Sequence, residues 1–221
     1  MDKILDIICI LIIVCCILKY VQIKRTCNKY NKINNKLSLS GCEVAQKLLG
    51  NNKLDDIYVV QTNNPLYEKY DSNRKVIRLS KKVFDDISIS AMVKASREVG
   101  YALLDKKHSK IYKIKDSLYM PINMLNYICY IVIVASCFLK DFKFLKIGLL
   151  SLLLIVIYHL LFYKFDRDNL KNISSQLKKY DMIDDEDEIK DLLNELSFCY
   201  VLYPIHLLTI LYILIKQKIN D

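Results

Sequence analysis

Four long apolar runs dominate the sequence and limit what the chain can fold into. They cover residues 4–23, 117–139, 147–163 and 196–215. A helix of about 20 apolar residues is long enough to cross the hydrocarbon core of a bilayer. We therefore predict an α-helical membrane protein with about four transmembrane helices.

Basic residues next to these runs predict the orientation of the chain. Lysine and arginine near the end of a membrane span tend to remain on the cytoplasmic side. One basic cluster follows the first run and another precedes the second: Lys19, Lys24, Arg25, Lys29, Lys32 and Lys36, then Lys106, Lys107, Lys110, Lys113 and Lys115. We therefore expect the domain between them to lie on the cytoplasmic side of the membrane.

The net charge of +9 belongs mostly to residues outside the apolar runs. A basic surface attracts either nucleic acid or anionic lipid, and the apolar runs of the same chain favour lipid. We expect the lipid bilayer and its anionic headgroups as partners and expect no nucleic acid. Membrane-protein and peptide partners stay open.

Residues 24–120 predict a small soluble α+β domain between the first and second spans. Ser40 and Glu43 have the spacing of a capping box at the start of a short helix. Three runs rich in β-branched and aromatic residues predict a small antiparallel sheet, at 57–61, 66–70 and 75–79. Ser88 is expected to cap a second helix, in which apolar residues recur with helical spacing.

The remaining segments complete the predicted organisation. They are an N-terminal transmembrane anchor (1–23), a transmembrane hairpin (121–163), post-hairpin helices (164–195) and a C-terminal transmembrane helix with its tail (196–221). A hairpin returns the chain to the side it left, so 164–168 should emerge on the membrane face that carries 97–101. The acidic run 184–188 lacks the glycine and the spacing of a calcium loop, and we interpret it as a solvated helix cap.

The second helix of the domain has the spacing of a zinc motif without its metal ligands. In His-Glu-x-x-His, two imidazoles on one helical face bind Zn²⁺, and the Glu acts on the bound water. Here Glu98 is present, but Arg97 and Tyr101 stand at the imidazole positions. Neither a guanidinium nor a neutral phenol is an ordinary zinc ligand.

The order of these segments resembles the membrane zinc metallopeptidases of the YugP-like (neutral zinc metallopeptidase) family. The likeness covers nearly the whole chain and includes 39–45, Tyr70-Asp71, 76–80 and 88–91. It continues into Arg97-Glu98-Val99-Gly100-Tyr101-Ala102, which looks like the family's His-Glu-Val-Gly-His-Ala. The resemblance implies a zincin-like fold for 24–120 and a third zinc ligand just after the hairpin, where this chain has Lys164.

All three ligand positions that the resemblance implies, Arg97, Tyr101 and Lys164, have therefore changed. We expect no cofactor here, although zinc is expected in the family, and we predict a catalytically inactive relative, a pseudo-protease with a binding or regulatory role. Glu98 would be the remnant of the general base, held in a structural pair with Arg97 or Lys164. Asp166 and Asp168 are candidate salt-bridge partners that would let Arg97 replace the zinc crosslink.

Two other functions stay open at this point. The first is an active membrane peptidase in which Glu98, Asp166 and Asp168 bind a harder cation, Mg²⁺ or Ca²⁺. The second is a channel or transporter built on His159 and His206, which lie in apolar runs. It ranks lower because the spans are few, and an interhelical hydrogen bond explains these histidines more simply.

Overall fold

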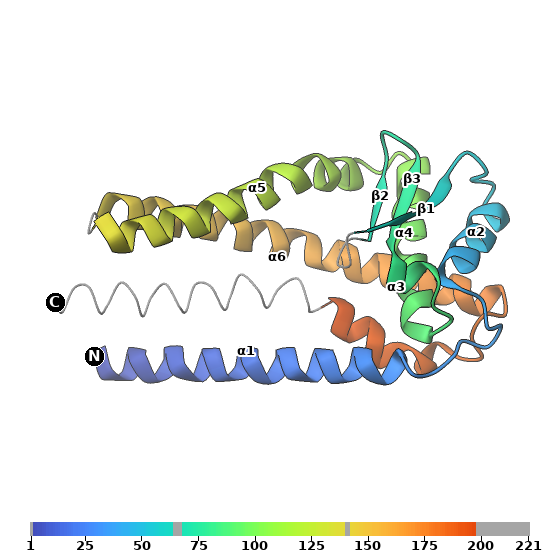
Figure 1. Cartoon of the computed structure of the whole chain (residues 1–221), viewed down its shortest axis with the longest axis horizontal. Coiled ribbons are helices and arrows are strands. Elements are labelled where there is room, and N and C mark those ends of the chain that lie inside the picture. The colour runs from blue at the N-terminus through green and yellow to red at the C-terminus, as the bar shows by residue number, and fades with distance from the viewer. Residues whose placement is uncertain (1, 64–67, 140–141, 198–221) are drawn as a thin grey trace. The chain divides into compact units, whose positions relative to one another are not determined.

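The computed structural model describes residues 2–63, 68–139 and 142–197 (Figure 1). The chain is mostly helical and contains one small sheet. It divides into two compact units. Of the described residues, the first comprises 2–23, 114–139, 142–164 and 197, and the second comprises 24–63, 68–113 and 165–196.

Three long helices occupy the first three predicted spans: α1 (Asp2–Tyr30), α5 (Lys110–Leu139) and α6 (Phe142–Lys179). Among the described residues, none of the helices combines the length and the apolar character needed to cross a membrane. The transmembrane helices predicted at 1–23 and 121–163 are therefore wrong for the part of these ranges that the structure describes. The helix predicted at 196–221 falls outside the described residues apart from its first two positions.

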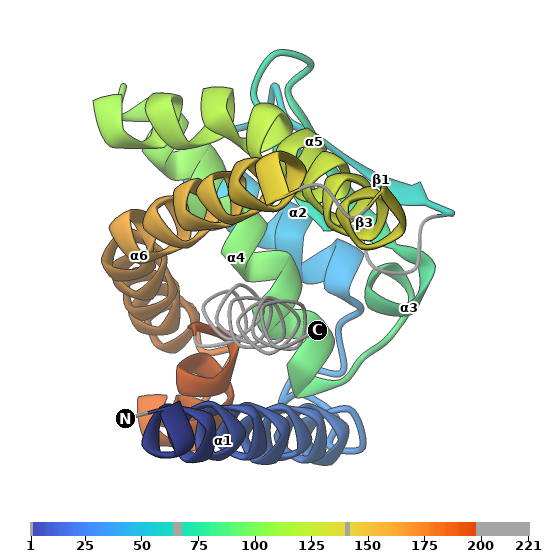
Figure 2. The same ribbon diagram turned by 90° about the vertical axis from the view of Figure 1, so that its left-hand side faces the viewer.

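In the first unit, α5 and α6 lie side by side (Figures 1 and 2). The Cys129 thiol donates to the Gly148 carbonyl at 3.5 Å, and the Tyr158 hydroxyl donates to the Lys115 carbonyl at 3.3 Å. His159 stacks edge-on against Tyr158, with ring centroids 5.3 Å apart. His206 lies outside the described residues, so the predicted pairing of the two histidines stays a prediction.

The second unit contains the predicted α+β elements. They are α2 (Gly41–Asn51), β1 (Tyr58–Thr62), β2 (Lys69–Asp71), β3 (Val76–Ser80), α3 (Lys81–Phe84) and α4 (Ile89–Lys106). The capping box of Ser40 and Glu43 is present at the start of α2, and the Ser88 side chain caps α4. Both caps are confirmed, since each depends only on residues within one turn.

The sheet has the strand order β1-β3-β2. β2 pairs with β3 antiparallel, as predicted, whereas β1 pairs with β3 in parallel. The prediction of a wholly antiparallel sheet is therefore wrong for β1. A tight turn, in which Asp71 accepts from the Arg74 amide at 3.1 Å, joins β2 to β3 and leaves the opposite edge of β3 for β1.

α4 lies in the middle of the second unit and is buried on nearly all sides. Its predicted apolar face is buried, and so are the polar residues Ser90 and Arg97. The core also includes β3 side chains, the apolar face of α2 and the part of α6 from Phe165 onward. Burying a polar group in such a helix is costly unless it is hydrogen-bonded, and the Oγ of Ser90 is buried without a hydrogen-bond partner among the described residues.

The acidic segment after α6 forms a cap. Asp185 accepts from the Glu186 amide at 2.7 Å and begins a 3₁₀ helix, Glu186–Glu188, before residues 190–197 become helical. Lys36 bridges Asp181 and Asp184 at 2.7 and 2.6 Å, which ties the loop after α1 to the loop after α6. The prediction of a helix cap is confirmed by these bonds.

Gly100 lets α4 and α6 approach closely. A Cβ at this position would overlap Asn169 Oδ1 and would lie 2.8 Å from Ile173 Cγ1. We therefore expect Gly100→Ala to lower the free energy of unfolding by about 1–3 kcal/mol, as overpacked cores do.

Gly50 provides the matched control, because its Cβ would meet no atom within 4 Å. Gly50→Ala should raise the stability by about 0.5–1 kcal/mol through helix propensity alone. Urea unfolding of both variants checks this pair. A Gly100→Ala protein as stable as the wild type would contradict the described packing of α6 on α4.

Candidate functional site: a buried Arg97–Glu98 pair beside β2

Glu98 lies on α4 with its carboxylate fully engaged. The Arg97 Nη2 and Nε atoms lie 2.8 and 2.9 Å from Glu98 Oε1. The other oxygen, Oε2, accepts from the backbone amide of Tyr70 at 3.0 Å. The side chains of Arg97 and Glu98 are only 8% and 3% exposed, so the two charges neutralise each other away from water. The predicted structural pairing of Glu98 with Arg97 is therefore present.

The bond to Tyr70 joins α4 to the edge of the sheet. β2 is an edge strand, and Tyr70 is the middle residue of that strand. Its amide points to Glu98 rather than to β3, so the carboxylate covers the open side of β2. The Tyr70 ring is buried, at 1% exposure.

The Tyr70 hydroxyl makes a second link to α4. It donates to Asp105 Oδ2 at 3.0 Å, and the Lys75 ammonium donates to the same oxygen at 2.8 Å. Burial raises the pKa of Tyr70 to about 12, the bond to Asp105 raises it as well, and Lys75 opposes the shift. The bond to Asp105 likewise raises the pKa of Lys75. This cluster keeps the phenol neutral over the physiological range.

Tyr101 connects α4 to α6. Its hydroxyl donates to Asp166 Oδ1 at 2.8 Å, and its ring stacks on Tyr112, with centroids 5.9 Å apart and an interplanar angle of 22°. One turn away, Asn169 Nδ2 donates to the Arg97 carbonyl at 3.2 Å. The two helices are thus crosslinked at residues 97–101 of α4.

The residues named from the sequence are distributed as follows. Arg97, Glu98, Tyr101 and Asp166 come together in the second unit. Asp168 is exposed, and the predicted ion pair from Arg97 to Asp166 or Asp168 stays a prediction. Lys164 is exposed. It is the last residue of the segment Ile114–Lys164, which belongs to the first unit.

Three residues of the site were not predicted: Tyr70, Tyr112 and Asn169. Tyr70 lies in a predicted strand, but only its backbone direction makes it a donor to Glu98. Asn169 follows the Asp166 segment by one turn, and its spacing from Asp166 was the one sequence signal that could have placed it on the same helical face.

The side chains at this site do not fit zinc. A guanidinium has no lone pair to donate, and here it occupies the carboxylate that would act beside the metal. Within the described part of the chain, no three His, Cys, Asp or Glu side chains gather as a metal-binding group. His108 is exposed at the end of α4, where its backbone has a φ of 51°.

Comparisons with known proteins agree with the architecture. A family model described as "Putative neutral zinc metallopeptidase" matches residues 5–218. The "Putative membrane protease YugP" of Bacillus subtilis (strain 168) is 26% identical over 140 residues, which are 63% of this chain and 62% of that protein. The chain therefore spans less than two thirds of the length of this curated relative. No solved structure matches.

The buried pair predicts a specific stability pattern. Glu98→Ala removes the carboxylate that pairs with the buried Arg97 guanidinium. We therefore expect a loss of about 3–5 kcal/mol in the free energy of unfolding. The double variant Arg97→Met with Glu98→Gln removes both charges and should be more stable than Glu98→Ala. Chemical denaturation followed by circular dichroism compares them, and equal losses in the two proteins would contradict a charge-paired site.

The Tyr70 cluster predicts a pH dependence at alkaline pH. The pKa of Tyr70 rises in the folded protein from 10.0 to about 12. The neutral phenol therefore stabilises the fold fully below pH 10, and this contribution is lost as the pH rises from 10 to 12. Between pH 9 and 11.5 the wild type should lose more stability than Tyr70→Phe, which has no phenol to ionise. Urea unfolding at the two pH values measures this difference. If the free energy of unfolding falls by the same amount in the wild type and in Tyr70→Phe, the pKa of Tyr70 is not raised.

Proposed function

Because the chain belongs to the neutral zinc metallopeptidase family, as its sequence resemblance predicted, we propose that it is a member that has lost zinc and peptidase activity. It keeps the family scaffold and acts by binding a partner or by regulating an active relative. The observation that carries this proposal is the Arg97 guanidinium on the Glu98 carboxylate.

The groups that bind the Glu98 carboxylate support the proposal that this residue does not act as a general base beside a metal. A general base needs a free carboxylate oxygen and a nearby activated water. Here Arg97 takes one oxygen and the Tyr70 amide takes the other. A dication placed beside Arg97 would meet a repulsion of several kcal/mol in a partly dry site.

The polar crosslinks supply a second line of support. In the family pattern, metal ligands on two segments would be joined by zinc. In this chain, the bonds from Tyr101 to Asp166 and from Asn169 to the Arg97 carbonyl join α4 and α6 directly. The scaffold therefore has no need of a metal to hold these helices together.

Peptidase activity with a harder cation on Glu98, Asp166 and Asp168 is the competing function. Glu98 is already neutralised by Arg97, and Asp166 accepts from Tyr101. Asp168 is exposed. Two of the three carboxylates would have to give up their present partners before a cation could bind.

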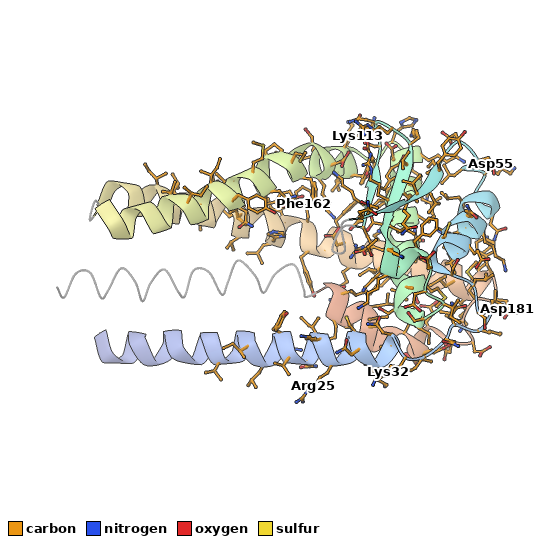
Figure 3. The ribbon with its side chains drawn as sticks, viewed as in Figure 1. Arg25, Lys32, Asp55, Lys113, Phe162 and Asp181 are labelled. Carbon is orange, nitrogen blue, oxygen red and sulfur yellow. The ribbon has the colours of Figure 1, made fainter. Side chains whose placement is uncertain are left out.

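Membrane association is part of the proposal. The Bacillus relative is named a membrane protease. Large apolar side chains are exposed on α5 and α6, including Tyr127, Ile131 and Leu161 at about 70%. Arg25 projects from α1 into solvent (Figure 3). These features suit contact with apolar and anionic parts of a lipid surface, with the second unit on the cytoplasmic side.

Metal analysis of the protein recovered from the membrane fraction of expressing cells tests this proposal. We expect far less than one zinc per chain after purification in zinc-containing buffer, and no fall in melting temperature with a chelator. Glu98→Gln is the control and should leave the metal content unchanged. Stoichiometric zinc or casein cleavage that disappears in Glu98→Gln would establish the enzyme, and recovery only in the soluble fraction would contradict membrane association.

A further inference from the structure

The two edges of the sheet differ in whether they are covered. At β2, the outward amide of Tyr70 is bound by Glu98. At β1, Tyr58 is 68% exposed and Val60 is 38% exposed. One edge is therefore closed by α4, and the other presents its side chains to solvent.

The backbone of β1 has unused hydrogen-bonding groups on its open side. The Tyr58 amide donates to the Lys75 carbonyl at 3.0 Å, so Tyr58 and Val60 direct their backbone groups toward β3. Val59 and Gln61 alternate with them and direct their amides and carbonyls outward. Within the described residues, no hydrogen-bond partner occurs for the amide of Val59 or Gln61.

The sequence of β1 lacks the usual protection of an edge strand. Natural edges are blunted by lysine, proline, bulges or very short strands. β1 is Tyr-Val-Val-Gln-Thr, a five-residue strand without charge or proline that pairs with β3 along its whole length. Such a strand is ready to pair with another extended chain.

We propose that the open edge of β1 binds an extended segment of a partner protein by strand addition. The alternating donors and acceptors of Val59 and Gln61 match the spacing of an extended polypeptide backbone. Tyr58 and Val60 favour apolar side chains at alternate positions of the partner. Asp55 and Asp56, exposed in the loop before β1, favour a basic residue at one end (Figure 3).

This binding site is separate from Glu98, which lies beside the opposite edge strand. It goes beyond the proposed loss of activity and does not depend on it. Metal content and casein cleavage test the first proposal, whereas peptide binding tests the second. Either can fail without the other.

Selection from a displayed library of random nine-residue peptides against the full chain tests the edge. We expect enriched peptides with alternating apolar residues and a basic end. Gln61→Pro removes an outward amide that the sheet does not use and should weaken the selected peptides at least about fivefold. Gln61→Ala keeps the amide and should bind within about twofold of the wild type.

Circular dichroism of both variants checks that the fold is retained, and Val59→Ala and Val59→Pro form a second pair if Gln61→Pro is unfolded. An absence of enriched peptides, or binding that is equal in the proline and alanine variants, would overturn the proposal. Dimers that are lost in Gln61→Pro would overturn it as well, because they would identify the occupant as a second copy of this chain.

Discussion

The buried ion pair of Arg97 and Glu98 is the interaction on which the second unit depends. A carboxylate at 3% exposure is costly unless its charge is compensated. In a zinc site the metal provides that compensation. The Arg97 guanidinium provides it here, so the two buried charges compensate each other.

The same pair organises the contacts of α4 with its neighbours. Glu98 reaches the β2 backbone, and the carbonyl of Arg97 accepts from Asn169 on α6. Gly100 provides the space for that approach, and Tyr101 adds the bond to Asp166. Hydrogen bonds and the ion pair of Arg97 with Glu98 thus hold together the three elements that meet at residues 97–101.

Local sequence patterns predicted the parts of this structure that depend on neighbouring residues. The caps at Ser40 and Ser88 and the apolar face of α4 are examples, because each is determined within a few turns. The pairing direction of β1 was missed because it depends on where a distant strand leaves space beside β3. The transmembrane prediction rested on apolar runs in the sequence, whereas none of the helices among the described residues has both the length and the apolar character of a span.

The site itself was predictable only in part. Glu98, Arg97 and Tyr101 follow from motif spacing, but the role of Tyr70 comes from its backbone amide, which no residue pattern records. That amide connects Glu98 on α4 with the edge strand β2. When Glu98 binds it, both carboxylate oxygens carry hydrogen bonds, and the β2 edge loses the outward donor at Tyr70. Glu98 therefore binds the outward amide of β2, whereas at the opposite edge of the sheet the amides of Val59 and Gln61 have no partner among the described residues.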